Sequence, residues 1–98
     1  MTELAEYCRA HGIGLLVANY PELHDVASYP FAAVTARVAA AAAAAGAPFI
    51  DLLPAVADVK DPESLWVTRT DAHPNGSAAG RYAARIAEAL RSTFSGKF

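Results

Sequence analysis

Two short apolar runs, separated by an alanine-rich stretch, most restrict the fold of this 98-residue chain. Residues 13–18 and 48–53 each have the length and the partly β-branched composition of a buried strand. Nearly continuous apolar strands are typical of parallel sheets that are covered on both faces. A helix between two such strands connects them in parallel through a right-handed crossover. We therefore expect an α/β fold with a parallel pair of strands.

The segment between the two runs predicts a loop followed by a helix. Residues 19–28 are polar and would form a loop at the carboxyl end of the first strand, where α/β proteins place their sites. Ser28 is expected to cap the helix and Gly46 to end it. Alanine is the strongest helix former, so the run at 39–45 indicates a close-packed helix. Its expected packing face consists of Phe31, Val34, Val38, Ala41 and Ala45.

Two further helices are expected near the ends of the chain. Thr2 and Gly12 mark the limits of a short first helix, and a long last helix runs over residues 75–94. Residues 62–69 are expected to be extended or irregular, with Trp66 docked onto the body as a packing anchor. The expected packing faces are Leu4, Tyr7, Cys8 and His11 on the first helix and Tyr82, Ile86, Leu90 and Phe94 on the last.

The small number of strands indicates that this chain is only part of a domain. A parallel sheet of two strands leaves two exposed edges and too little surface to shield them, so such a unit is rarely stable by itself. Much of the apolar content is alanine, which gives a modest core volume. We interpret residues 1–98 as a single partial domain of a larger α/β sheet, and we expect self-association through an exposed sheet edge.

Charge and cysteine content narrow the class of protein. A formal net charge of -2 gives no basic footprint, so nucleic acid is not an expected partner. Cys8 is the only cysteine, which leaves no intrachain disulfide or thiolate metal cluster and predicts a buried thiol. Residues 1–3 carry neither a basic region nor an apolar run, so the chain as written lacks a secretion signal and is expected in the cytoplasm. No apolar stretch approaches the roughly 20 residues needed to span a bilayer.

Residues 65–75, Leu-Trp-Val-Thr-Arg-Thr-Asp-Ala-His-Pro-Asn, hold the candidate chemistry of the chain. Asp71 and His73 stand two residues apart, directly ahead of the last helix. An imidazole that acts as a base needs a group to deprotonate. None of the serines lies on a strand-to-helix turn in a Gly-x-Ser setting, so the chain offers no evident nucleophile.

The chain resembles the C-terminal part of SGNH/GDSL-family hydrolases over nearly its whole length. The resemblance rests on the order of the first helix, the apolar run, the Pro-Glu-Leu-His-Asp loop at 21–25, the alanine-rich helix and the second apolar run at 47–53. Its sharpest part is Thr-Asp-Ala-His-Pro-Asn at 70–75, which is similar to that family's last sequence block. The resemblance implies a flavodoxin-like three-layer α/β/α fold, of which this chain holds two parallel strands and three main helices.

The resemblance also implies carboxylic ester hydrolysis by a Ser-His-Asp triad, without a cofactor or metal. His73 matches the base of that family, and Asp71 is the nearest match to its orienting acid. The common spacing places the acid three residues before the histidine, where this chain has Thr70. The family's Gly-Asp-Ser block and the two blocks that complete its oxyanion hole have no match in these 98 residues. The expected function is therefore that of a fragment that supplies the His and Asp side of the triad for a small ester substrate, inactive alone.

Two other functions stay open. The chain is alternatively a non-catalytic binding or assembly module that uses an exposed sheet edge to hold a partner strand. In a third hypothesis Asp71 and His73 are ligands of a divalent metal ion, although two ligands are too few for a site.

Each polar side chain also has a structural interpretation. His73 and Asp71 are alternatively a surface histidine and a loop or capping residue, and Asn75 is an expected N-cap. His24 either lines an acyl pocket or faces solvent from its loop. His11 is explained by a favourable interaction with a helix C-terminus.

Overall fold

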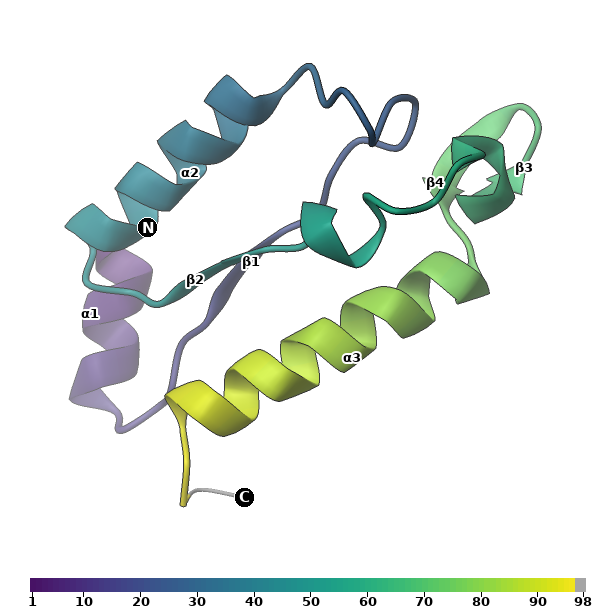
Figure 1. The fold of residues 1–98 in the computed structure, drawn as a ribbon. Helices are drawn as coiled ribbons and strands as arrows, with labels where there is room; N and C mark the ends of the chain where they lie inside the picture. The colour runs from purple at the N-terminus through teal and green to yellow at the C-terminus, as the bar shows by residue number, and fades with distance from the viewer. Residues whose placement is uncertain (97–98) are drawn as a thin grey trace.

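The structure is a computed structural model that describes residues 1–96, and it has a small α/β fold (Figure 1). A two-stranded sheet lies between two helices, and a second small sheet stands at one end of the longer helix. The elements in chain order are α1 (Thr2–Ala10), β1 (Val17–Asn19), α2 (Ala32–Ala44), β2 (Phe49–Asp51), the short 3-10 helices η1 (Leu53–Ala55) and η2 (Pro62–Leu65), β3 (Trp66–Thr68), β4 (Asp71–Pro74) and α3 (Gly76–Thr93).

The strands β1 and β2 pair in parallel, as the two apolar runs predict. Val17 lies opposite Phe49, and Asn19 lies opposite Asp51, with α2 as the connection. Both strands are shorter than the runs, and their residues are half-buried, where burial on both faces was expected. The first run begins with Ile13, whose side chain is 50% exposed, because neither β2 nor a further strand reaches it.

The antiparallel hairpin of β3 and β4 was not predicted from the sequence. Trp66 pairs with Pro74 and Thr68 with Asp71, with a register shift between them. Residues 62–69, expected to be extended or irregular, hold the 3-10 helix η2 and the extended strand β3, and the Asp-Ala-His-Pro block is itself β4. Pro74 lacks a backbone donor, which is tolerated because β4 ends there at the edge of a two-stranded sheet.

Local sequence signals correctly predict the start of α3 and the ends of α1 and α2. Asn75 caps α3, since its Oδ1 accepts a hydrogen bond from the backbone N–H of Ala78 at 3.1 Å. Gly12 and Gly46 follow the ends of α1 and α2 with φ of 66° and 72°, in the left-handed region that favours glycine.

The two other predicted caps are wrong. The N-cap of α1 is Met1 in place of Thr2, and it makes no side-chain capping bond. Ser28 lies ahead of α2, and its backbone N–H donates to Asp25 Oδ1 at 2.8 Å. Phe31 takes the N-cap position of α2, also without a capping side chain. Pro30 lies between Ser28 and Phe31 and disfavours a helical backbone at the preceding residue, Tyr29. The helix therefore starts after Pro30.

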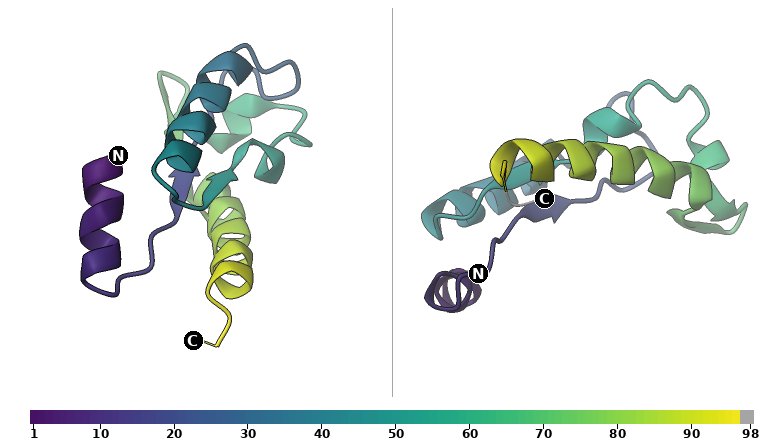
Figure 2. Two further views of the ribbon diagram at one scale, coloured as in Figure 1. Left: turned by 90° about the vertical axis from the view of Figure 1, so that its left-hand side faces the viewer. Right: turned by 90° about the horizontal axis from the view of Figure 1, so that it is seen from below.

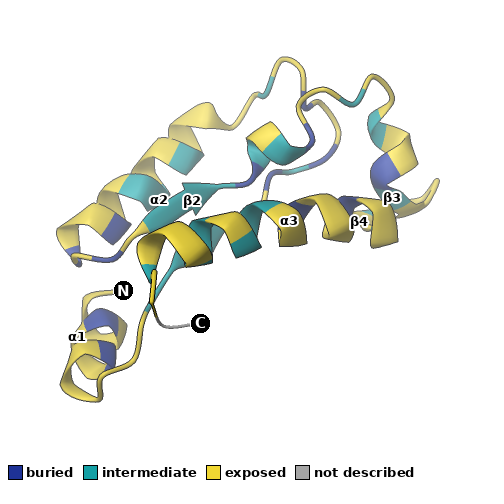
Figure 3. Cartoon of the chain, turned by 60° about the horizontal axis from the view of Figure 1, so that its bottom comes forward, coloured by how far each residue is buried: buried dark blue, intermediate teal, exposed yellow. Residues whose placement is uncertain are grey.

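The core lies where α3 meets the loop after β1 and the segment after β2 (Figure 3). The predicted face of α3 is confirmed, because Tyr82 is buried and Ile86, Leu90 and Phe94 are half-buried. The core cluster consists of Leu23, Val26, Leu52, Val56, Leu65, Ala78 and Tyr82.

The packing faces predicted for α1 and α2 are only partly right. Cys8 is buried as expected, but Leu4 and Tyr7 are more than half exposed. On α2 the apolar first turn is exposed, with Val34 at 55%, and Ala42 is the buried residue. Figure 3 shows α1 at one end of the molecule, and Arg9 Nη1 of α1 donates to the backbone oxygen of Ala45 at 3.0 Å. A sheet of two strands is too narrow to cover these faces.

The remaining predicted residues of the α2 face are exposed at Phe31 and Ala41, half-buried at Val38 and buried at Ala45.

Candidate functional site

Strand β4 brings Asp71 and His73 into direct contact. His73 Nδ1 lies 2.5 Å from Asp71 Oδ1, and the backbone N–H of His73 donates to the same oxygen at 3.0 Å. Residues two apart in a strand point to the same face. The spacing of two residues, unusual for the family that the chain resembles, therefore still lets this carboxylate reach the ring.

The electrostatics of this pair fix which ring nitrogen is available. Hydrogen bonds from the side chain and backbone of His73 hold the pKa of Asp71 below its ordinary value, so the carboxylate is ionised at neutral pH. An ionised carboxylate accepts hydrogen bonds only, so Nδ1 of His73 carries the proton that it shares. The Nε2 atom is then free to accept a proton from a reacting group. The His73 side chain is 86% exposed, which leaves this atom accessible.

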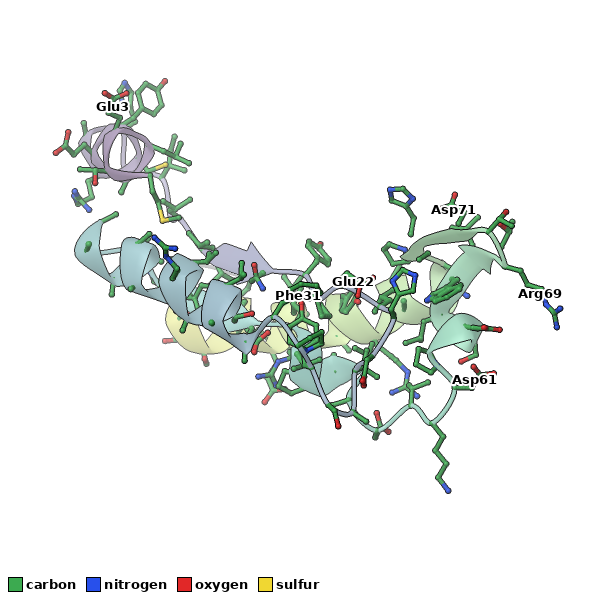
Figure 4. All side chains as sticks on the ribbon, turned by 90° about the horizontal axis from the view of Figure 1, so that it is seen from above. Glu3, Glu22, Phe31, Asp61, Arg69 and Asp71 are labelled. Carbon is green, nitrogen blue, oxygen red and sulfur yellow. The ribbon has the colours of Figure 1, made fainter. Side chains whose placement is uncertain are left out.

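An open hollow of about 440 Å³ lies beside His73. One wall is the loop at the carboxyl end of β1, and the other is the β3–β4 turn with β4. The hollow therefore lies at the carboxyl end of β1, where the sequence predicts a site. Figure 4 shows Glu22 and Asp71 on these two segments. Thr70 contributes the only hydroxyl among the lining residues of the described chain, and none of them is a serine. The lining residues are Pro21, Glu22, Leu23, Thr70, Asp71, Ala72, His73 and Pro74.

A second acid and histidine pair, Glu22 and His24, was missed by the sequence analysis. His24 Nδ1 contacts Glu22 Oε1, and the backbone N–H of His24 donates to Glu22 Oε2 at 3.1 Å. Partial burial of Glu22 opposes its ionisation, but the hydrogen bonds from His24 outweigh that effect and lower the pKa of Glu22. The signal was present, because both pairs have the acid two residues before the histidine.

Trp66 fixes the loop that carries this second pair. Its Nε1–H donates to the backbone oxygen of Leu23 at 2.9 Å, and its ring lies against the His24 ring with centroids 4.8 Å apart. Trp66 is thus the packing anchor that was expected. His24 is exposed and does not line the hollow, which favours the solvent-facing interpretation over the acyl pocket.

Asn75 connects the hairpin to α3 in addition to capping that helix. Its Nδ2 donates to the backbone oxygens of Ser64 at 2.8 Å and Trp66 at 3.0 Å. Its backbone N–H donates to the oxygen of Leu65 at 2.8 Å. Because His73 lies two residues before Asn75, these bonds hold the backbone that places the His73 imidazole beside the hollow.

Two other polar side chains, those of Asp51 and His11, make structural contacts. Asp51 Oδ1 accepts from the backbone N–H of Leu53 at 3.0 Å at the end of β2. His11 Nδ1 lies 2.8 Å from the oxygen of Tyr7 at the C-terminus of α1, where an interaction with the last carbonyls was expected. Within residues 1–96, no three His, Cys, Asp or Glu side chains are arranged to hold a metal ion, so Asp71 and His73 gain no third ligand.

No protein-family model, curated protein or solved structure matches this chain. Among residues 1–96, no helix is both long and apolar enough to cross a bilayer.

Proposed function

We propose that this chain supplies the base, His73, and the orienting acid, Asp71, of an SGNH/GDSL-type serine ester hydrolase. The observation that carries the proposal is the 2.5 Å contact between His73 Nδ1 and Asp71 Oδ1 beside an open hollow. In a Ser-His-Asp triad the carboxylate binds Nδ1 and holds the tautomer in which Nε2 is the base. The substrate class is a small carboxylic ester.

The chemistry requires groups from outside this chain. A serine hydroxyl attacks the ester carbonyl while Nε2 of His73 takes its proton, and the imidazolium then protonates the departing alcohol. The charge that develops on the carbonyl oxygen needs aimed donors, and the loss of one costs about 100-fold to 1000-fold in rate. No serine lines the described hollow. We therefore infer that another polypeptide segment supplies the nucleophile and the oxyanion hole.

The first test is the hydrolysis of p-nitrophenyl acetate by the isolated chain and by its His73→Ala variant. Equal rates are expected, because the imidazole has no nucleophile to activate. A clear rate that depends on His73 would mean that the chain contains its own nucleophile and would refute the division of the triad. The second test reads the DNA upstream of the coding sequence. An in-frame Gly-Asp-Ser block supports the proposal, and its absence from the DNA on both sides of the coding sequence would count against it.

A non-catalytic binding or assembly module is the second candidate, and the outer edge of β1, which pairs with no strand in residues 1–96, favours it. Such an edge presents backbone groups that pair with a strand of another chain or of a second copy. A monodisperse oligomer in analytical ultracentrifugation, without esterase activity even after addition of a serine-bearing half, is the expected behaviour of this module. A monomer at all concentrations would rule out assembly with itself.

A further inference from the structure

A cluster of three side chains, Glu22, His24 and Trp66, joins the loop after β1 to the hairpin. The indole N–H of Trp66 in β3 donates to the backbone oxygen of Leu23 at 2.9 Å, and the Trp66 and His24 rings have centroids 4.8 Å apart. His24 Nδ1 also contacts the Glu22 carboxylate. Both views in Figure 2 show this loop near the hairpin, at the end of α3 away from the C-terminus. The His24 ring thus contacts a carboxylate of its own loop and an aromatic ring of the hairpin.

The cluster belongs to both walls of the hollow beside His73. Glu22 and Leu23 line the hollow from the loop, and His73 lines it from β4. Trp66 pairs with Pro74 of β4 across the hairpin. The hydrogen bond from Trp66 to Leu23 is therefore a direct link between the two walls, and a change in its strength changes how firmly the walls are held together.

The other bonds of the loop do not depend on the charge of the His24 ring. The Tyr29 hydroxyl accepts from the backbone N–H of Glu22 at 2.9 Å, and the backbone N–H of His24 donates to Glu22 Oε2 at 3.1 Å. Leu23 is 2% exposed and belongs to the core cluster. These contacts keep the loop in place, so the charge of the imidazole acts on the contact between the loop and Trp66 alone.

A proton on His24 strengthens both contacts of its ring. Histidine is the side chain that ordinarily gains its charge between about pH 5 and 8. An imidazolium forms an ion pair with an ionised Glu22 and a cation–π contact with the Trp66 ring. Partial burial opposes the ionisation of Glu22, but the hydrogen bonds from His24 outweigh that effect and lower the pKa of Glu22. The carboxylate therefore stays charged where the imidazole gains its proton.

Glu22 is the charged partner of His24 among residues 1–96, since no other charged side chain there forms a hydrogen bond or an ion pair with it. Figure 4 shows Arg69 directed away from Glu22. His73 is a second imidazole beside the hollow, so its protonation has to be separated from that of His24 by a variant. The other charged groups on the adjoining segments are Asp25 on the loop, Asp61 and Glu63 on η2, Arg69 on the turn, and Asp71 and His73 on β4.

We propose that Glu22, His24 and Trp66 form a proton-sensitive clamp, which holds the two walls of the hollow together more firmly when His24 is protonated than when it is neutral. The clamp regulates how readily the loop wall moves away from the wall that carries His73. It rests on the contacts of the three side chains, so it stands whether or not the chain takes part in ester hydrolysis.

The indole N–H of Trp66 reports directly on the clamp, because it is the donor of the bond between the walls and belongs to the only tryptophan of the chain. Its exchange with water is measured by NMR in the full chain at about pH 5 and about pH 8, relative to N-acetyltryptophanamide at the same pH. An exposed ion pair and an exposed cation–π contact should together raise the protection of this N–H by about threefold to tenfold at the lower pH.

Matched variants assign the response to His24. His24→Gln keeps a polar side chain without a charge that depends on pH, so the indole N–H should be equally protected at the two pH values. His73→Gln removes the other imidazole of the hollow and should keep the full response. Both histidines are exposed, so neither variant disturbs the core. Glu22→Gln keeps the contact with Trp66 but removes the ion pair, and should give a smaller response.

Three results would overturn the clamp. They are equal protection of the Trp66 indole N–H at both pH values in the unmodified chain, a response that persists in His24→Gln, and a response that disappears in His73→Gln. The last result would assign the proton sensor to His73 and Asp71. If circular dichroism shows that His24→Gln is unfolded, His24→Asn takes its place and must lose the response as well.

Discussion

Substitution of Asn75 tests how the hairpin that carries His73 is held on the body. The side chain makes three hydrogen bonds, one from Ala78 N–H to Oδ1 and two from Nδ2 to the oxygens of Ser64 and Trp66. Asn75→Ala removes all three. Asn75→Ser keeps an oxygen that caps α3 but loses both donors, so the pair of variants separates the cap from the connection to the hairpin.

The magnitude follows from these contacts. A helix N-cap contributes about 1 kcal/mol, and each of the two other hydrogen bonds contributes about 0.5 to 1 kcal/mol because they are partly exposed. We expect Asn75→Ala to lower the free energy of unfolding by about 2 to 3 kcal/mol, and Asn75→Ser by about 1 to 2 kcal/mol. These are large fractions of the roughly 5 to 15 kcal/mol typical of a small domain.

The assay is urea unfolding followed by the fluorescence of Trp66, the only tryptophan in the chain, with circular dichroism as a second probe. Trp66 lies in β3, next to the bonds that are removed, so its emission reports directly on the hairpin. If Asn75→Ser unfolds at the same urea concentration as the unmodified chain, the bonds to Ser64 and Trp66 contribute nothing to stability. The connection of the hairpin to α3 would then have to come from packing.

Three further results are expected. In His73→Ala the pKa of Asp71 should rise toward its ordinary value in a carbon NMR titration, because the side-chain hydrogen bond that lowers it is lost. In the unmodified chain the pKa of Asp71 is lower in the folded state than in the unfolded state. The pair therefore stabilises the fold above about pH 4, and this stabilisation is lost as the pH falls through the folded pKa. An unchanged Asp71 titration would mean that the two side chains do not interact in solution. Tyr82→Phe removes a buried hydroxyl without a partner in the described chain, and should raise the stability of the isolated chain by up to about 1 kcal/mol in urea unfolding; a loss of similar size would reveal a partner for that hydroxyl. Gly46→Ala should cost about 1 kcal/mol in thermal unfolding because φ is 72° there, and a gain in stability would show that the turn relaxes.

Those parts of the fold that depend on strong local signals are predictable from the sequence. The parallel pair follows from two apolar runs around a helix, and the limits of α3 follow from a good N-cap at Asn75 and a periodic apolar face. The phase of α2 is different, because a helix made mostly of alanine has little contrast between its faces. Its buried residue is Ala42, one position from the predicted Ala41.

The hairpin escaped prediction because its strands are too short to show a period. β3 has three residues and β4 has four, and a proline at the end of β4 suggested the start of a helix. Without the hairpin, the sequence alone did not show how the Asp71 carboxylate reaches the His73 ring. In a loop the spacing of two residues gives no fixed geometry, whereas in a strand it places both side chains on one face. Glu22 and His24 were overlooked for the same reason, since their contact depends on a loop held by Trp66.

The contact between Asp71 and His73 is made within β4, a strand of four consecutive residues that pairs with the neighbouring strand β3. Its geometry is therefore set before any nucleophile arrives. In the proposed triad, a serine brought to Nε2 would meet an acid and a base that are already aligned, so assembly would have to fix one relative position instead of two.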